Sequence, residues 1–249
     1  MSPACVGLIP ARGGSKRVPD KNIRLLAGHP LLAYTVAAAL DSGVFDRVIV
    51  STDSARYAEA AIHYGAEVPF LRPTGIAGDT SPDIEWVAYT LDRLAREGVF
   101  FDCFSILRPT SPFRGPETIR RAWEVFLSAA GADSLRAVEK CAQHPCKMWR
   151  VEGERIRPVM EWGTAKAPGH SSQYVSLPEI YVQNASLEIA WTSAPLEQGS
   201  IAGTEIVPFF TRGAEGVDVN REIDFDYADL LVRRGEAALP KVTIRPWAG

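Results

Sequence analysis

Over the first half of the chain, short apolar runs alternate with longer stretches of helical periodicity. The apolar runs are rich in β-branched residues and predict strands. The predicted strands are Cys5–Ile9, Arg47–Ser51, Glu67–Leu71, Phe101–Leu107 and Ser134–Val138. The predicted helices are Leu31–Ser42, Ala55–Tyr64, Ile84–Glu97 and Pro116–Ala129, and glycines follow several of them. This alternation predicts an α/β protein with a doubly wound, parallel sheet.

The alternation stops after Val138 and returns near Ile180. Residues of about 140–180 are rich in Pro, His, Trp and Gln and show no regular α/β pattern. We interpret this segment as an inserted β-hairpin or arm that forms an oligomer contact or a lid. Ile180–Trp191 then predicts a strand, and the segment after it leads to a loop and a final helix. We expect one domain over residues 1–240 with this arm inserted, and a loosely held tail over 241–249.

Composition and charge exclude several classes of protein. The 249 residues are 46% hydrophobic, yet no segment approaches the ~20 consecutive apolar residues that span a bilayer. We find no secretory signal pattern, and the four scattered cysteines favour a reducing, cytoplasmic location. The grouping of Cys141, His144 and Cys146 lacks the second ligand pair that zinc usually requires. A formal net charge of −3 argues against a nucleic-acid-binding protein.

The first predicted strand runs directly into a glycine-rich, basic turn. This turn carries Arg12, Lys16, Arg17, Lys21 and Arg24. Gly13 and Gly14 let the backbone bend tightly and bring N–H groups close to a ligand. Several cations on such a loop favour a highly charged anion, such as a nucleoside triphosphate. The spacing is neither that of a Walker A loop nor GxGxxG, and a solvated turn or a nucleic-acid patch are the alternatives.

Two further polar segments follow predicted strands. They are Thr52–Asp53 and Arg108–Arg114. Ligands of doubly wound sheets bind beyond the carboxyl ends of the strands. We therefore expect these segments and the basic turn to share one crevice.

Seven motifs, in this order, resemble those of the acylneuraminate (nonulosonate) cytidylyltransferases. They are IPARGGSKRVPDKNI (9–23), VIVSTDS (48–54), FLRPTGIAGDTS (70–81), LRPTSPFR (107–114), QHPCKMW (143–149), LPEIYVQN (177–184) and GVDVNREIDFDYA (216–228). The resemblance extends from about residue 6 to 235. It implies a Rossmann-like, mostly parallel sheet with a small inserted dimerisation arm. It also implies that CTP and a nine-carbon α-keto sugar acid react to give a CMP-sugar and pyrophosphate.

This reaction requires cations and in-line positioning, because charge accumulates on the leaving pyrophosphate. The resemblance makes Arg12 and Lys21 the catalytic cations on the triphosphate, and Asp218 the ligand of Mg²⁺. It assigns contacts with CTP to Gly13, Gly14, Lys16, Asn22, Arg72 and Ser81. It assigns contacts with the acceptor sugar to Arg108, Lys147 and Asn184.

Three positions depart from the family's pattern. Asn220 stands where many relatives have a second Asp, so Asp218 is the one predicted metal ligand. The residues after Asn184 differ from the usual NGAI. Arg108 stands where the sialic acid enzymes commonly have Gln, and it brings a permanent positive charge. This last change indicates that a legionaminic, pseudaminic or deaminated acceptor is as good a candidate as N-acetylneuraminate.

Some of these residues also have a plain structural interpretation. Asn22 can serve as a turn or cap residue, and Arg72 can be an ordinary exposed loop arginine. Lys147 can face solvent, and Asp53 can cap the helix that follows it.

The sequence thus predicts a cytoplasmic, Mg²⁺-dependent cytidylyltransferase that forms a homodimer through its arm and binds neither nucleic acid nor membrane. One alternative is another sugar nucleotidyltransferase, such as a CMP-keto-deoxy-octulosonate synthetase. The other is a non-catalytic nucleotide-binding subunit, since a fold alone does not prove activity.

Overall fold

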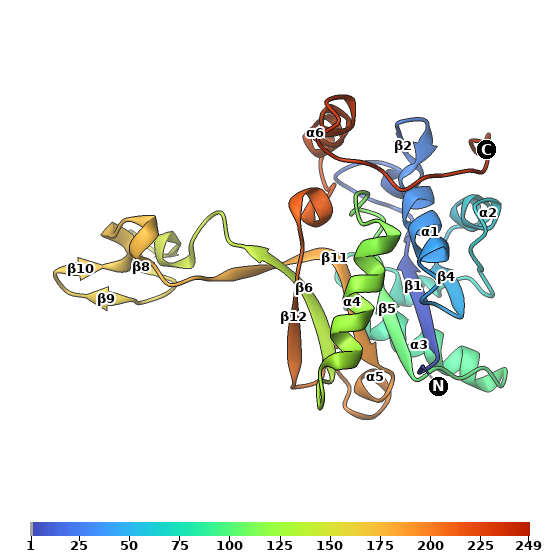
Figure 1. The fold of residues 1–249 in the computed structure, drawn as a ribbon, viewed down its shortest axis with the longest axis horizontal. Helices are drawn as coiled ribbons and strands as arrows, with labels where there is room; N and C mark the ends of the chain where they lie inside the picture. Colours follow the sequence, from blue (N-terminus) through green and yellow to red (C-terminus); the bar gives the residue numbers. More distant parts are fainter. Residues whose placement is uncertain (1) are drawn as a thin grey trace. The chain divides into compact units, whose positions relative to one another are not determined.

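The computed structural model describes residues 2–249, which form two compact units. Unit 1 comprises residues 2–137 and 184–249, and unit 2 comprises residues 138–183. The chain passes from one unit to the other within strands β6 (Ser134–Lys140) and β11 (Tyr181–Trp191), as Figure 1 shows. Unit 2 contains the part of the sequence in which the α/β alternation is lost.

Unit 1 is built around a six-stranded sheet with the strand order β12-β6-β11-β5-β1-β4. β1 (Cys5–Pro10) pairs in parallel with both β4 (Arg47–Ser51) and β5 (Cys103–Ile106). β11 runs antiparallel to β5, and β12 (Ile206–Phe210) forms one edge of the sheet. The sheet is mixed but mostly parallel, which confirms the predicted α/β fold class.

The four helices predicted for the first half of the chain form within one residue of their expected ends. The helices of unit 1 are α1 (Leu31–Ser42), α2 (Ala55–His63), α3 (Asp83–Arg96), α4 (Pro116–Ser128), α5 (Ser193–Glu197) and α6 (Glu222–Arg233). Gly43 ends α1 with a left-handed backbone, at φ 66°, a conformation that glycine adopts without steric cost. Ser54 begins α2, and its side chain accepts a hydrogen bond from the Tyr57 N–H.

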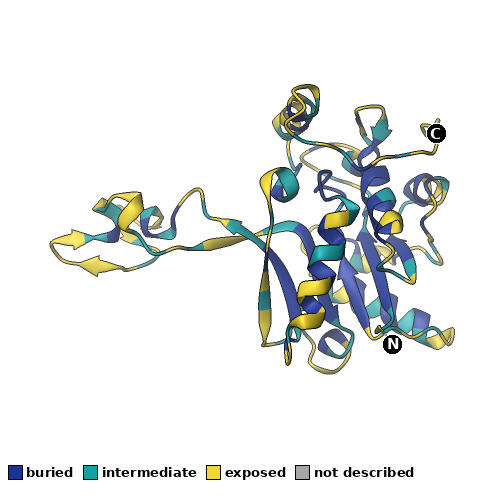
Figure 2. Ribbon diagram, viewed as in Figure 1, coloured by how far each residue is buried: buried dark blue, intermediate teal, exposed yellow. Residues whose placement is uncertain are grey.

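Helices cover both faces of the sheet, as the alternation of side chains on β1 shows. Cys5 and Ile9 belong to one buried cluster, whereas Val6 and Leu8 belong to another. The first cluster includes apolar side chains of α1, α2 and α4, and the second includes those of α3. Because successive strand residues point to opposite faces, this pattern requires apolar layers above and below the sheet. The central strands β1, β4 and β5 are accordingly largely buried in Figure 2, whereas most of the edge strand β12 is exposed.

Short elements complete the two units. In unit 1 they are η1 (Lys21–Ile23), β2 (Leu25–Leu26), β3 (His29–Pro30), η2 (Thr74–Ile76) and η6 (Gly213–Gly216). Unit 2 holds two antiparallel hairpins, β7 (Trp149–Glu152) with β8 (Arg155–Pro158) and β9 (Gly163–Thr164) with β10 (Ala167–Pro168). It also holds the 3-10 helices η3 (Pro145–Lys147), η4 (Gly169–Ser171) and η5 (Tyr174–Ser176). Much of unit 2 is exposed in Figure 2.

The strand predicted at Glu67–Leu71 does not form, and that prediction is wrong. Glu67 makes a single parallel bridge with Ile49, after which the chain leaves the sheet. Pro69 explains the difference, because proline has no N–H to donate to a neighbouring strand. The segment after it is thereby free to turn toward the carboxyl ends of β1 and β4.

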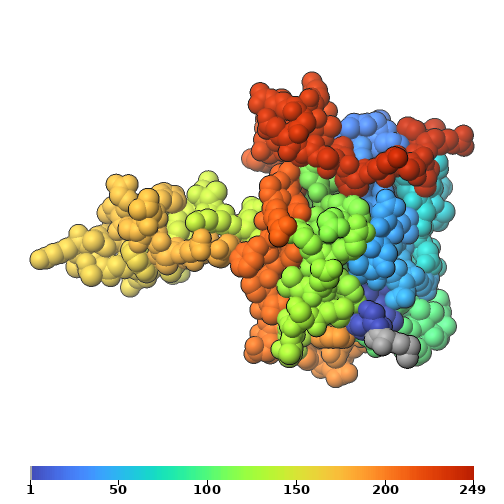
Figure 3. All heavy atoms as spheres, viewed as in Figure 1, coloured from blue at the N-terminus to red at the C-terminus, as the bar shows by residue number. Residues whose placement is uncertain are grey.

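The C-terminal segment, expected to be loosely held, makes specific contacts with unit 1. The Trp247 N–H donates to the Tyr64 hydroxyl at 3.0 Å, and the Arg245 carbonyl lies 2.8 Å from His63 Nε2. Trp247 also packs against the main core cluster. Figure 3 shows this segment, in red, lying across the surface of unit 1 beside α1. No helix among residues 2–249 has the length and apolar character needed to cross a bilayer.

Candidate active site

A crevice with a volume of about 370 Å³ lies at the carboxyl ends of β1 and β5. Pro10 at the end of β1 and Pro109 just after β5 both line it, together with parts of residues 72–86 and 218–220. Seven of the twelve residues predicted from the sequence also line it: Arg12, Lys21, Asn22, Arg72, Ser81, Arg108 and Asp218. The basic turn and the segment after β5 therefore meet at one place in unit 1.

The basic turn is held to its neighbours by polar contacts from its own backbone. Gly13 donates its N–H to Asp53 Oδ1 at 2.7 Å, and Gly14 adopts φ +67°, a left-handed conformation suited to glycine. Asn22 is buried, and its amide donates to the Arg12 carbonyl at 3.3 Å. Asp53 thus anchors the turn, while the neighbouring Ser54 caps α2. This role of Asp53 was not anticipated from its position before a helix.

Two cations of the turn, Arg12 and Lys16, share one acidic partner, Asp79. Arg12 Nη2 lies 2.5 Å from one oxygen of its carboxylate, and Lys16 Nζ lies 2.5 Å from the other. Hydrogen bonds from Lys16 and Arg12 hold the pKa of Asp79 below its usual value. Lys16 lines an adjoining hollow of about 350 Å³ that also contains Arg12, Lys21 and Asp79. Sequence reasoning missed Asp79, although it lies between the two predicted CTP contacts Arg72 and Ser81.

Lys21 reaches the acidic side of the crevice through Asn220. Its Nζ donates to Asn220 Oδ1 at 2.9 Å, and the Asn220 amide nitrogen donates in turn to the Asp218 carboxylate. Burial lowers the pKa of Lys21, and the nearby Asp218 charge opposes that effect. Asp224, in the first turn of α6, accepts the backbone N–H of Asn220 at 2.9 Å and so fixes this segment.

Among the residues that line the crevice, Asp218 has the one buried side-chain oxygen without a hydrogen-bond partner in residues 2–249. Its Oδ1 accepts no hydrogen bond there, although the atom is buried. No group of three His, Cys, Asp or Glu residues in that range is arranged to hold a metal ion. An unpartnered carboxylate oxygen is a ligand that a hard cation such as Mg²⁺ can take singly, with phosphate oxygens and water completing its shell.

Arg72 is buried, so its interpretation as an exposed loop arginine is wrong. It is 5% exposed, and it donates to the hydroxyl of Ser51 at 3.1 Å and to the Ser51 carbonyl at 2.9 Å. Its guanidinium lies 4.8 Å from the centre of the Trp86 ring. Burial lowers the pKa of Arg72 to about 10. These contacts fasten residues 72–81 to the end of β4 and place Arg72 at the wall of the crevice.

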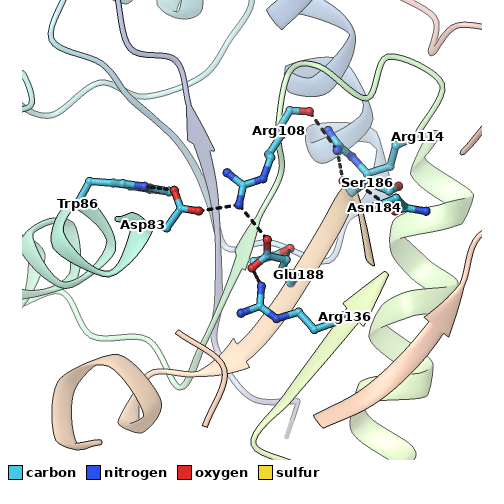
Figure 4. A network of polar contacts seen from close by, with 9 residues as sticks. Asp83, Trp86, Arg108, Arg114, Arg136, Asn184, Ser186 and Glu188 are labelled. Atoms are coloured by element: carbon cyan, nitrogen blue, oxygen red, sulfur yellow. Dashed lines mark hydrogen bonds and ion pairs between the residues drawn. The ribbon is translucent and has the colours of Figure 1, made fainter. Parts of the chain in front are cut away.

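Arg108 lies between two carboxylates, as Figure 4 shows. Its Nη2 donates to Asp83 at 2.7 Å and to Glu188 at 2.9 Å. The other oxygen of Glu188 pairs with Arg136. The positive charge expected at Arg108 is therefore paired with carboxylates, and within these four residues two cations and two carboxylates balance. Burial raises the pKa of Asp83, but the hydrogen bond and charge of Arg108, the hydrogen bond from Trp86 and the charge of Arg72 together outweigh it, so the pKa is lowered.

Lys147 and Asn184 do not line the crevice. Lys147 lies in unit 2, where its Nζ donates to the carbonyls of His170 and Ser172 at 3.0 and 2.6 Å. It is therefore tied to its own unit and does not simply face solvent. Asn184 donates to the Thr211 hydroxyl at 2.9 Å, and the next residue, Ala185, lines the crevice in its place.

A doubly wound sheet with a crevice lined by cations and carboxylates beyond its strand ends is typical of α/β nucleotide-binding proteins. The sequence profile described as Cytidylyltransferase matches residues 6–133. The chain is 36% identical over 237 residues to a CMP-N,N'-diacetyllegionaminic acid synthase of Legionella pneumophila, covering 94% of this chain and 98% of that relative. It is 40% identical over 225 residues to an N-acylneuraminate cytidylyltransferase of Escherichia coli.

That second match covers 90% of this chain but 51% of the relative, so the chain spans about half of the E. coli enzyme. Among solved structures, a CMP:2-keto-3-deoxy-manno-octonic acid synthetase complexed with CTP aligns with a TM-score of 0.67 and 13% identity. The alignment covers 93% of this chain and 99% of that one, and it shows a shared fold. The chain belongs to the cytidylyltransferase family and is an enzyme of its acylneuraminate type.

Proposed function

We propose that this enzyme transfers CMP from CTP to the anomeric hydroxyl of a nine-carbon α-keto sugar acid and releases pyrophosphate. The acceptor is of the sialic, legionaminic or pseudaminic type. One observation carries the proposal: Arg12, Lys21 and Asp218 line a single crevice in a chain that matches a CMP-N,N'-diacetyllegionaminic acid synthase over nearly its whole length. The octonic acid synthetase shares the fold at 13% identity, which supports no particular acceptor.

The cations of the basic turn suit the triphosphate end of this reaction. The acceptor oxygen forms a bond to the α-phosphorus while the bond to the pyrophosphate oxygen breaks, and negative charge builds up on the leaving group. Arg12, Lys16 and Lys21 would hold the triphosphate and offset that charge, helped by the backbone N–H groups near Gly13 and Gly14. Arg12 and Lys16 pair with Asp79 in the structure, and on CTP binding they would pair with phosphate oxygens in place of that carboxylate.

Asp218 is the residue that would hold Mg²⁺. Its buried, unpartnered Oδ1 supports this role. The side-chain oxygen of Asn220, beside it, accepts a hydrogen bond from Lys21. When bound, the cation would supply further positive charge to the phosphate oxygens. The remaining work of this segment is to position Lys21, through the chain of hydrogen bonds from Lys21 to Asn220 and Asp218.

The base of CTP would lie near Asn22, Arg72 and Ser81, which line the same crevice. Arg72 supports this arrangement because its guanidinium is fixed by Ser51 and Trp86 before any ligand binds. A guanidinium offers donors to the acceptor edge of cytosine, and a base with a donor at that edge would leave them unpaired.

Unit 2 would join two copies of the chain into a homodimer, because several of its apolar side chains are exposed. Val151, Ile156, Val159, Tyr174 and Val175 are all more than half exposed. Exposed apolar groups gathered in one small unit are typical of interaction surfaces. Light scattering on Val175→Asp and on wild type tests this: a dimer that becomes a monomer supports it, and a monomeric wild type refutes it.

We place the enzyme in the cytoplasm, where its four free cysteines would stay reduced.

Pyrophosphate release is the experiment that tests the proposed reaction. The enzyme is incubated with Mg²⁺, one nucleotide (CTP, UTP or ATP) and one acceptor (a sialic, legionaminic or pseudaminic acid, or an eight-carbon octulosonic acid). We expect release that requires CTP together with a nine-carbon acid, and a CMP-sugar formed in equal amount. Release with the eight-carbon acid alone would favour the octulosonate alternative, and no release with any pair would refute the proposal.

A further inference from the structure

Four ionic side chains form a network beside the crevice, at the meeting point of α3, β5, β6 and β11 (Figure 4). They are Asp83 at the start of α3, Arg108 just after β5, Arg136 on β6 and Glu188 on β11. Glu188 and Arg136 are buried, at 5% and 9% exposed, whereas Asp83 and Arg108 line the crevice. Asp83, Arg136 and Glu188 are not among the residues proposed to bind CTP, the metal or the acceptor.

The hydrogen bonds of Arg108 are unevenly distributed over its guanidinium. Both carboxylates are bound by the same nitrogen, Nη2, at 2.7 Å to Asp83 and 2.9 Å to Glu188. Within the described chain, residues 2–249, Nε and Nη1 donate no hydrogen bond. A guanidinium has five N–H donors, so three of them remain available to a ligand in the crevice.

The backbone that carries this network is fastened by Arg114, which is fully buried. Its Nη1 donates to the Arg108 carbonyl at 3.2 Å and to the Ser186 carbonyl, and its Nη2 donates to the Thr35 hydroxyl at 2.9 Å. Arg114 therefore ties the segment of Arg108 to the strand of Glu188. A site held in this way by buried side chains is set before its ligand arrives.

The charge balance of the network decides which ligand group suits Arg108. Two cations and two carboxylates cancel, and the carboxylates of Asp83 and Glu188 would repel another anion. The free N–H groups of Arg108 can still donate to an uncharged oxygen. The names of both relatives compared above contain acylated sugar acids, diacetyllegionaminic acid and N-acylneuraminate, and an acylamino carbonyl is such an oxygen.

We propose that Glu188 is a positioning residue for acceptor specificity: with Asp83 it fixes Arg108 and balances its charge, so that Arg108 donates to the carbonyl of an acylamino group. This inference rests on the proposed function and assigns one group of the acceptor to one wall of the crevice. Glu188 acts through Arg108 and has no contact of its own with the acceptor. Arg136 holds the second oxygen of Glu188 and keeps that carboxylate in place.

Steady-state kinetics with two matched acceptors test the inference. The acceptors differ only at one carbon, which carries either an acylamino group or a hydroxyl. Wild type is expected to favour the acylamino acceptor in kcat/KM. Glu188→Gln should raise the KM for that acceptor by about 10–100-fold, the factor expected for a hydrogen bond to a charged group. The KM for CTP should change by less than about twofold, since the triphosphate lies on other residues.

Two comparisons separate positioning from a general structural role. In an Arg108→Gln background, Glu188→Gln should cause no further loss, because its effect passes through Arg108. Glu67→Gln is the control variant: it also removes a carboxylate from an ion pair with an arginine, Arg47, but Glu67 does not line the crevice. It should leave both acceptors unaffected. Melting temperatures of all variants show whether each one is folded.

The possible results are decisive in different ways. An unchanged Glu188→Gln variant, equal losses with both acceptors, or additive losses with Arg108→Gln would overturn the inference and leave the proposed function standing. A wild type that uses no acceptor would refute the proposed function itself. If Glu188→Gln does not fold, Asp83→Asn replaces it, because Asp83 binds the same nitrogen from a less buried position. It should weaken the preference for the acylamino acceptor, and an unchanged preference would refute the inference.

Discussion

Replacing Lys21 with methionine should slow catalysis strongly while leaving the protein folded. Methionine keeps most of the length of the side chain but removes the ammonium group, which is partly buried and lies 2.9 Å from Asn220 Oδ1. A unit charge about 4 Å from a phosphate oxygen is worth about 4 kcal/mol at an effective dielectric constant of ~20. Only the part of this interaction energy that increases as pyrophosphate leaves affects kcat. Loss of one oriented donor to developing charge costs roughly 10²–10³-fold, and we expect that range.

The folded state should lose much less. Lys21→Met leaves Asn220 Oδ1 without its donor, and one such hydrogen bond contributes about 1 kcal/mol to the free energy of unfolding. Urea unfolding measures that quantity, and pyrophosphate release at saturating CTP and acceptor measures kcat. Lys241→Met serves as the control, because Lys241 is exposed and lines neither hollow of the site. A kcat within threefold of wild type, or an equal loss in the control, would refute the role of Lys21.

Three further outcomes are expected. Because burial lowers the pKa of Lys21, its positive charge is lost as pH rises through that lowered pKa. A plot of kcat/KM for CTP against pH should therefore fall on its alkaline side below pH 10.5, the ordinary pKa of lysine. Lys21→Arg should shift this fall to higher pH. Arg114→Ala removes a fully buried guanidinium and leaves its acceptors unpaired, so urea unfolding should show a loss of about 3 kcal/mol or more. Asp218→Asn should lower kcat at least about 100-fold, and adding Mg²⁺ to this variant should not restore its kcat.

Features that depend on residues close together in the sequence could be predicted from it. Apolar periodicity placed α1 at Leu31–Ser42 and β4 at Arg47–Ser51 with the ends that the structure has. The glycines and cations after β1 predicted a ligand loop, and the structure lines the crevice with Arg12 and Lys21. The strand expected at Glu67–Leu71 was wrong because the apolar pattern was given more weight than a proline within it.

Features that depend on distant residues could not be predicted in this way. Asp79 pairs with Arg12 across 67 positions of the chain, and Glu188 pairs with Arg108 across 80. No local pattern marks such a partner, because an acid near a helix or on a strand has many possible neighbours. Arg72 shows the same limit, since arginines are mostly exposed and only the folded chain places this one against Trp86.

The charges of the site are arranged differently at its two ends, and this difference separates the two substrates. At the basic turn, Arg12 and Lys16 share the single carboxylate of Asp79 and Lys21 donates to the uncharged Asn220, so an excess of positive charge remains for phosphates. At the other end, Arg108 and Arg136 are each paired with a carboxylate, and these four charges cancel. We therefore expect the triphosphate to bind at the basic turn, and hydrogen bonds to uncharged groups to select the acceptor beside the paired charges. Replacing Arg108 with Gln should accordingly change acceptor choice far more than the salt dependence of CTP binding, which reports the charge at the basic turn.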